Sequence, residues 1–533
     1  MAWPVLLVLA ASQFLMVLDA AVMNVSISQL VADFHTDVTT IQAVIAFYSL
    51  VMAALFLTGG KLGDLLGRRR AFVIGHAVYA CGSLLTALSW SVAALALGWS
   101  VLEGIGAAVV LPALAALVAG NFTGRERAVA YGVLGGVSGA GIAVGPILGG
   151  WVTENLTWRL VFAGEVVVAA GIVLAAPRLV RDAPRGGPAP ALDWVGSVLS
   201  ALGIGAIVFG VLQASTWGWI RPNDSPITPF GFALTPFVIA AGGVALYGFR
   251  AWERRREKRG ETPLVRLRLF SIAPLRSGLA TFLGQNTVLM GVFFAVPLYL
   301  QIVQGFNAFE TGVKMLPTSI ALFVTALGGA RLASRFAPRT IVRAGCALLL
   351  AAVVYLLATI EPQIDTLNFG IAMALLGVGM GLVLSQLGNV VQSAVDEEDR
   401  GEAGGLQYTA QQSGSAMGTA LIGAIVITGL AAAFTTKIAD DPSISQATRD
   451  QVSVRLESGV SFVSSDEVRK AASDANLPPA EADAIVAGYE SAQLNALKLG
   501  LLVCGFIVLG TGLATRNLPS ERLARAGPEP PRS

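Results

Sequence analysis

The sequence is poor in the residues on which most catalytic and metal sites depend. Its 533 residues include two histidines and three cysteines, and 13% of them are charged. Cys81, Cys346 and Cys504 lie within apolar runs, where they behave as small hydrophobic residues and build no disulfide or metal framework. No GxxxxGK[ST] phosphate loop is present, so ATP is not expected to be the direct energy source. We therefore expect no enzyme activity, no cofactor and no metal.

A strong charge imbalance is also missing. Lysine and arginine exceed aspartate and glutamate by two, which predicts no nucleic-acid partner. Apolar residues, by contrast, make up 54% of the chain and gather in continuous runs near or above the ~20 residues that cross a bilayer as a helix. A barrel would alternate with period two, so we predict an all-α integral membrane protein. The fourteen predicted transmembrane helices are residues 4 to 27, 41 to 60, 71 to 89, 92 to 119, 128 to 152, 160 to 177, 192 to 213, 229 to 250, 275 to 300, 311 to 330, 340 to 359, 367 to 390, 404 to 433 and 495 to 515.

Positive charges predict the orientation of these spans. Clusters such as "GRRR" and "RAWERRREKRG" follow even-numbered spans, whereas "ADFHTDVTT" and "QGFNAFE" after odd-numbered spans carry no lysine or arginine. Loops rich in lysine and arginine stay in the cytoplasm. We therefore predict a multi-pass protein of the cell membrane with both termini in the cytoplasm. The first run lacks a charged segment before it, so a cleaved signal peptide is not expected.

The loops divide the chain into three parts. A segment rich in proline and glycine, "RLVRDAPRGGPAPALDW", and a basic stretch from 250 to 268 enclose two spans. This predicts an amino-terminal six-helix bundle in residues 1–180, linkers with two extra helices in 181–270, and a carboxy-terminal six-helix bundle in 271–533. The bundles echo each other, because "GGKLGDLLGRR" aligns with "GARLASRFAPR", Leu62 with Leu332 and Arg69 with Arg339. Repeated halves of this kind are a transporter architecture with the site between them.

One polar, acid-rich loop, residues 434–495, lies on the predicted outer side. "SSDEVRKAA" carries a capping box from Ser464 to Glu467, and "PPAEADAIVAGYESAQ" has prolines at a plausible first turn. We expect two or more short helices outside the membrane. A solvated cap is the simpler interpretation of this loop, and a gate or a docking domain is the alternative.

Three acids in predicted spans have no basic residue in the same span: Asp19, Glu103 and Glu165. A charge at that depth costs roughly 3 kcal/mol on insertion scales. Desolvation and neighbouring carboxylates both favour the protonated form, so such a group can exchange a proton near neutral pH. We interpret the three as proton-coupling sites or as counter-charges for a cationic substrate. The simpler alternative is structural pairing with polar neighbours such as Gln13 or Asn24.

Two glycine-rich motifs are candidates for conformational roles. In "GGKLGDLLGRRR", glycines permit close helix contact and the acid can cap a helix or pair with an arginine, although a positive-inside anchor explains the basic cluster equally well. In "GAGIAVGPILGG", glycines four apart form a face for close packing and a proline favours a bend. Packing alone would also explain this second motif. The residues singled out are Gly60, Asp64, Gly67, Arg68, Arg69, Gly141, Gly145, Pro146, Gly149 and Gly150.

These motifs resemble those of the major facilitator superfamily. "GGKLGDLLGRRR" is similar to its signature loop between helices two and three, "GAGIAVGPILGG" to its antiporter motif in helix five, and "LDAAVMNVSIS" to the first-helix motif of the fourteen-spanner drug:proton antiporter branch. Ser100 and Glu103 stand where that family has an arginine and a glutamine in helix four, and Glu165 stands where it often has asparagine. The role that this arginine has in the family mechanism is therefore not carried over to the present sequence.

The resemblance implies a monomeric proton-coupled exporter of amphipathic, cationic or lipophilic drugs, which works by alternating access in a lipid bilayer. An exporter of a dedicated lipid or secondary metabolite is one alternative, and a sensor or scaffold that no longer transports is another. Polar side chains in both halves are candidates to line the substrate cavity, although packing bonds between helices would explain such amides equally well. These candidates are Gln13, Asn24, Gln285, Asn286, Gln386, Asn389, Gln407 and Gln411.

Overall fold

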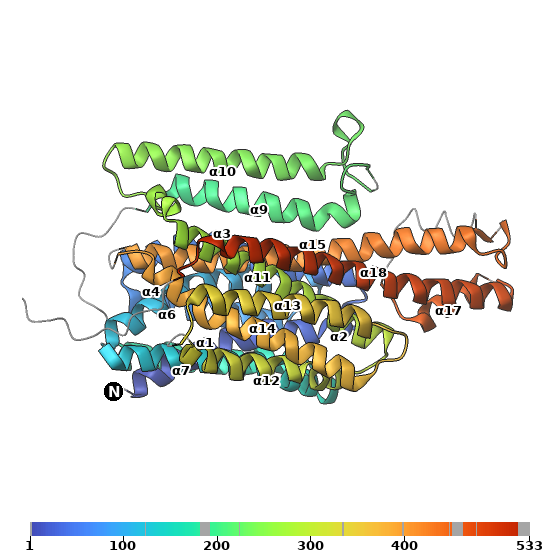
Figure 1. Cartoon of the computed structure of the whole chain (residues 1–533), viewed down its shortest axis with the longest axis horizontal. Coiled ribbons are helices and arrows are strands. Elements are labelled where there is room, and N and C mark those ends of the chain that lie inside the picture. Colours follow the sequence, from blue (N-terminus) through green and yellow to red (C-terminus); the bar gives the residue numbers. More distant parts are fainter. Residues whose placement is uncertain are drawn as a thin grey trace, which may run out of the picture.

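The computed structural model describes residues 3 to 520 except 123, 182–191, 223, 333–334, 397–398, 447, 450–461 and 476. Helices account for most of these described residues, and no strand occurs among them. The all-α prediction is confirmed. Figure 1 shows a bundle of long, roughly aligned helices with one pair of helices set apart along its side.

The first six predicted spans form one group of packed helices. α1 packs on α7 and α8, while α4 packs on α6 and α8. The span predicted at 92–119 is one continuous helical segment in three parts, α5, the π-helical turn η1 and α6. The elements of this group are α1 (Trp3–Val25), α2 (Ile27–Phe34), α3 (Val38–Leu66), α4 (Arg68–Ala87), α5 (Val92–Leu95), η1 (Ala96–Glu103), α6 (Gly104–Asn121), α7 (Gly124–Asn155) and α8 (Arg159–Leu179).

The central helix pair lies beside this group. α9 (Trp194–Trp217) and α10 (Thr235–Lys258) pack against each other, and α9 also contacts α3 and α15. Figure 1 shows α10 farther from the bundle than α9. The short 3-10 turns η2 (Pro229–Gly231) and η3 (Leu267–Ser271) precede and follow α10.

The last six predicted spans form the second group. α11 packs on α15 and α18, and α14 packs on α12 and α13. The two groups meet along two seams, α7 against α12 and α3 against α15. The elements are α11 (Ala273–Leu298), η4 (Tyr299–Val303), α12 (Ala308–Leu332), α13 (Pro338–Thr359), α14 (Thr366–Ser393), α15 (Arg400–Asp440), α17 (Ser465–Asp474), α18 (Pro479–Ala514) and η6 (Thr515–Asn517).

Each predicted span coincides with a helix, but the count of fourteen crossings stays a prediction. Within the described residues, eleven helical segments are long and apolar enough to cross a membrane. α7, α10 and α12 are not among them. α10 ends in a cluster of charges, "RAWERRREK", which lowers the hydropathy of any window that includes it.

The predicted outer loop contains the short helix α17, but the helix expected after it is part of a longer one. The capping box of α17 is present, with the Ser464 hydroxyl accepting from Glu467 N and the Glu467 carboxylate accepting from Ser464 N. The second predicted short helix is wrong as a separate element, because α18 runs unbroken from Pro479 to Ala514. Strong helix formers fill this stretch, and Tyr489 packs edge-on against Phe434 of α15. Figure 1 shows α15 and α18 extending together beyond the rest of the bundle.

Candidate functional site

The three predicted acids meet in one buried cluster within the first helix group. Asp19 comes from α1, Glu103 from the end of η1 and Glu165 from α8. Asp19 and Glu103 are fully buried, and Glu165 is 2% exposed. One carboxylate oxygen from each lies within 4.8 Å of the others. Residues 146 positions apart in the sequence are thereby brought to one point, which the sequence alone did not establish.

Neutral hydrogen-bond donors, not cations, face these acids. The indole N–H of Trp99 donates to Asp19 Oδ1 at 2.6 Å, and the Thr86 hydroxyl donates to Glu103 Oε1 at 3.1 Å. No described residue forms an ion pair with any of the three.

Glu165 has donors of the same neutral kind. The hydroxyl of Tyr79 lies 3.0 Å from Glu165 Oε2, and that of Ser83 lies 3.4 Å from the same oxygen. The second oxygen of each of the three acids, Asp19 Oδ2, Glu103 Oε2 and Glu165 Oε1, is buried with no hydrogen-bond partner among the described residues. Every acid in the cluster therefore keeps one oxygen free to carry a proton.

The local backbone explains why these groups converge. η1 is a π-helical turn, which shifts the register of the residues that follow and is frequent at functional sites. Gly82 of α4 lies so close to η1 that a Cβ there would stand 2.7 Å from Glu103 N and from Gly98 O. This close approach brings Thr86 within hydrogen-bonding distance of Glu103. Neither the π turn nor the contact was predicted.

The cluster cannot hold several negative charges at once. Two unit charges 4.8 Å apart repel by about 3.5 kcal/mol even at an effective dielectric constant of 20. Because no positive side chain among the described residues pairs with these acids, the carboxylates must share protons or a mobile cation. The donors around them stabilise one carboxylate at a time through charge-assisted hydrogen bonds.

A resident metal fits this cluster poorly. The three acids are a group of described residues whose ligand atoms lie close enough for one ion. Bound through one oxygen each, they supply three ligands, whereas Ca²⁺ takes six to eight and Mg²⁺ requires an octahedron.

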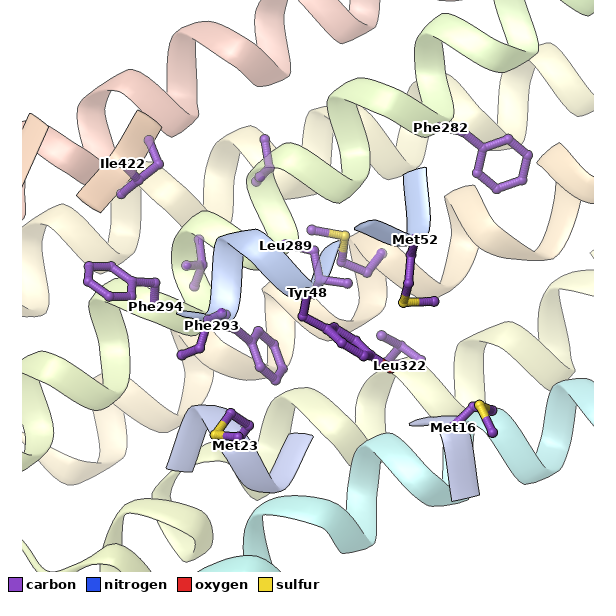
Figure 2. Close-up of a cluster of buried hydrophobic side chains, with 14 of the residues drawn as sticks. Met16, Met23, Tyr48, Met52, Phe282, Leu289, Phe293, Phe294, Leu322 and Ile422 are labelled. Carbon is purple, nitrogen blue, oxygen red and sulfur yellow. The ribbon is translucent and has the colours of Figure 1, made fainter. Parts of the chain in front are cut away.

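An aromatic stack connects the acid cluster with the centre of the bundle. Trp99 stacks on Tyr48 of α3, with ring centroids 4.4 Å apart and planes inclined by 13°. Tyr48 belongs to a cluster of buried apolar side chains drawn from both helix groups (Figure 2). Figure 2 shows the Tyr48 ring directed towards Leu322 of α12, in the opposite helix group. The other side chains labelled in Figure 2 are Met16, Met23, Met52, Phe282, Leu289, Phe293, Phe294 and Ile422.

The predicted cavity amides are scattered rather than gathered at the acids. Gln285 donates to the Met380 carbonyl at 3.4 Å, and Gln386 donates to the Gly329 carbonyl at 2.9 Å. Both are bonds between helices of the second group, the packing role considered as an alternative. Asn286 donates to Phe282 O of its own helix, and the exposed Asn389 accepts from Ser393. Gln13, Gln407 and Gln411 are partly buried on α1 and α15.

The glycine- and arginine-rich motif covers the end of α3 and the start of α4, and not a loop alone, and it holds together the ends of neighbouring helices. Gly67 has φ of 94°, a conformation that favours glycine. Arg69 donates to the Pro177 carbonyl at 3.3 Å and Arg68 to the Ala116 carbonyl at 3.5 Å, both near helix carboxyl ends where a positive charge is favourable. A Cβ at Gly60 would lie 3.9 Å from Pro112, so this glycine is not tightly confined.

The glycine face of α7 packs on α1, the helix that carries Asp19. A Cβ at Gly141 would lie 3.0 Å from Val17, at Gly145 2.4 Å from Ala21 and at Gly149 2.9 Å from Val22. Gly150 is also buried in this helix. The side chains of Asn24, Asp64 and Pro146 lie outside the residues that the structure describes, and their roles stay predictions.

A network of ion pairs at the predicted cytoplasmic side was missed by the sequence analysis. Lys61 of α3 lies 3.7 Å from Glu402 of α15. Arg266 contacts Glu402 at 3.4 Å and Asp399 at 2.6 Å, and Arg268 contacts Asp399 at 2.8 Å. The segment after α10 therefore binds the start of α15, which in turn binds α3.

Two packed groups of long apolar helices, with acids buried inside one of them, define a membrane transporter fold. The chain belongs to the Major Facilitator Superfamily, which it matches over residues 9–419. This family consists of transporters and not enzymes, as predicted. A bacterial homolog of the human lysosomal transporter Spinster, solved in an inward-facing and unoccupied conformation, has the same fold, with a TM-score of 0.58 and 16% identity over 98% of each chain.

Three curated relatives are named for export, transport or efflux. The Tetracenomycin C resistance and export protein of Streptomyces glaucescens is 30% identical over 99% of this chain and 94% of its own. The probable actinorhodin transporter of Streptomyces coelicolor is 31% identical over 82% and 75%. The multidrug efflux pump LfrA of Mycolicibacterium smegmatis is 31% identical over 80% and 81%.

Proposed function

We propose that the protein exports amphipathic, cationic or lipophilic small molecules in exchange for protons. The observation that carries this proposal is the cluster of Asp19, Glu103 and Glu165, whose oxygens lie within 4.8 Å of one another. The cluster is buried without a cation among the described residues. A buried carboxyl group binds a proton because burial disfavours the negative charge of the carboxylate. It releases the proton when a positive or polarising group comes close. Two or three acids would allow more than one proton per cycle.

The two helix groups supply the moving parts in this proposal. They meet along α7 with α12 and α3 with α15, and rocking along these seams would expose the central apolar cluster to one side at a time. Methionine and aromatic side chains adapt to ligands of different shape, which suits an exporter of several compounds. In this account the protein acts as a monomer in the cell membrane, with both termini in the cytoplasm and no cofactor besides the proton gradient.

A dedicated secondary metabolite is the second candidate for the substrate. Two relatives are named for tetracenomycin C and actinorhodin, which favours a single metabolite over a broad range of drugs. A panel of substrates would distinguish the two: similar flux for unrelated cations supports multidrug export, whereas flux for one compound alone supports the dedicated exporter.

Transport by purified protein in liposomes tests the proposal. Liposomes loaded with ethidium are given a pH gradient of either direction or none, and ethidium release is followed by fluorescence. We expect release to be at least several-fold faster with the gradient that drives protons inward. Equal release in all three conditions would contradict proton coupling. No flux of any compound would support the scaffold alternative.

A further inference from the structure

Trp99 and Tyr48 lie between the acid cluster and the place where the two helix groups meet. One face of the Tyr48 ring stacks on Trp99 with centroids 4.4 Å apart. The ring itself points towards Leu322 of the opposite helix group (Figure 2). Trp99 in turn donates its only N–H to Asp19 at 2.6 Å. Tyr48, Trp99 and Leu322 belong to one cluster of buried apolar side chains drawn from both helix groups, and the two aromatic rings join this cluster to one acid.

Both rings are buried among packed side chains. Trp99 is 1% exposed and Tyr48 is 4% exposed. Trp99 lies in the π-helical turn η1. The residue that follows Trp99 in this turn, Ser100, donates to the Val44 carbonyl of α3 at 2.8 Å. This bond keeps η1 against α3, the helix that carries Tyr48. A displacement of Tyr48 would therefore remove the ring against which the Trp99 indole stacks.

We propose that Tyr48 and Trp99 are positioning residues through which a planar aromatic substrate at the centre of the bundle controls the proton on Asp19. This inference rests on the proposed function. When the helix groups separate, Tyr48 loses the apolar side chains that it faces across the seam. A planar aromatic molecule can replace them by stacking on the free face of the ring. Met16, Met23 and Met52, labelled in the same cluster, adapt to its outline.

The direction of coupling follows from the chemistry of the indole. An N–H donor stabilises a carboxylate more than a carboxylic acid. A substrate that supports the Tyr48 ring holds the Trp99 N–H on Asp19 and favours the carboxylate. The O–H bond of protonated Asp19 then breaks, the proton passes to water and the Trp99 hydrogen bond remains on the resulting anion. Substrate binding thereby releases a proton, as an exchanger requires.

Proton release on binding ethidium tests the inference. Purified protein in weakly buffered detergent is mixed with ethidium, and both bound dye and released protons are measured from pH 5.5 to 8.5. Trp99→Phe keeps an aromatic ring but removes the N–H. We expect it to bind ethidium within about threefold of the wild type, while the pH of half-maximal proton release rises by about one unit, the scale of one charge-assisted hydrogen bond.

A matched control exists in the same protein. Trp158 is also buried, 1% exposed, and donates to Asp33 Oδ2 at 2.8 Å, outside the acid cluster. Trp158→Phe makes the same chemical change and should leave proton release unaltered. Tyr48→Leu should raise the midpoint of proton release as Trp99→Phe does, because the stack on the indole is lost, and it should also weaken ethidium binding, because the ring that stacks on the dye is gone. Tyr48→Phe keeps the ring and should restore ethidium binding.

The outcomes distinguish the proposed function from the positioning role of the two aromatic residues. If the wild type binds ethidium but releases no proton, the proposed function fails. If the wild type releases protons and both Trp99→Phe and Tyr48→Leu release them with the same midpoint, the positioning role is overturned alone. If Trp99→Phe does not fold, Tyr48→Leu is the test. A raised midpoint of proton release supports the positioning role, and an unchanged midpoint overturns it.

Discussion

Lys61 and Glu402 form an ion pair of 3.7 Å between α3 and α15, helices predicted to belong to opposite halves of the protein. Both side chains are 13% exposed. Glu402 also binds the backbone N–H of Arg266 at 3.1 Å. The segment after the central helix pair thus contacts the same carboxylate that connects the two halves. In a protein whose halves move, such a contact has to break once in each cycle.

Asp399 accepts hydrogen bonds from two arginines of this ionic network, and its neutralisation should weaken the network. It is 3% exposed and accepts from Arg266 at 2.6 Å and from Arg268 at 2.8 Å. Asp399→Asn is expected to cost about 1 to 3 kcal/mol, the range for hydrogen bonds to charged groups. Thermal unfolding in detergent measures this change.

The control for Asp399→Asn is an exposed pair of equal length. Arg469 and Asp483 lie 2.6 Å apart with side chains 57% and 67% exposed. Asp483→Asn should cost less than about 1 kcal/mol. Equal losses of stability in the two variants would mean that burial does not strengthen the Asp399 pairs.

Gly145 tests how closely α1 and α7 approach. A Cβ at this position would lie 2.4 Å from Ala21 Cβ, so Gly145→Ala must push the helices apart or strain them. We expect a loss of about 1 to 3 kcal/mol. Gly164→Ala in α8, where a Cβ meets nothing within 4 Å, should be neutral or stabilising by up to about 1 kcal/mol. Gly145→Ala should therefore lower the melting temperature, whereas Gly164→Ala should leave it unchanged or raise it.

Glu253 gives the protein a pH-dependent stability at its predicted cytoplasmic side. Glu253 lies beyond the span predicted to end at residue 250, where burial and the nearby Asp193 carboxylate raise its pKa from 4.5 to about 7. A raised pKa in the folded state means that folding binds a proton. The contribution is therefore fully present below pH 4.5 and is lost as the pH rises towards and through 7.

Glu253→Gln should flatten this dependence. The variant keeps an oxygen that can accept from Leu264 N, which now donates to Glu253 at 2.9 Å, but it cannot titrate. Melting temperatures measured from pH 4.5 to 8 should fall for the wild type relative to the variant as the pH rises. A constant difference between the two proteins across this range would show that Glu253 does not titrate there.

The sequence predicted the helices and the three acids, but not how the acids are connected. Continuous apolar runs and a charge in each of three spans are visible without a structure. The partners of the acids are not, because Trp99 and Tyr79 look like ordinary apolar-face residues in their own helices. Their contacts depend on the π turn of η1 and on the approach of α4 at Gly82. The extension of α18 beyond its predicted span was missed for a related reason. Its Tyr489 packs on Phe434 of α15, which is far away in sequence.

The most direct test of proton coupling compares two transport modes of Asp19→Asn in liposomes. In one mode a proton gradient drives ethidium against its concentration difference, and in the other ethidium exchanges across the membrane with no gradient. We expect Asp19→Asn to lose most of the gradient-driven accumulation but to keep exchange near the wild-type rate, because the substrate path remains intact. Full gradient-driven accumulation by this variant would contradict the role assigned to Asp19.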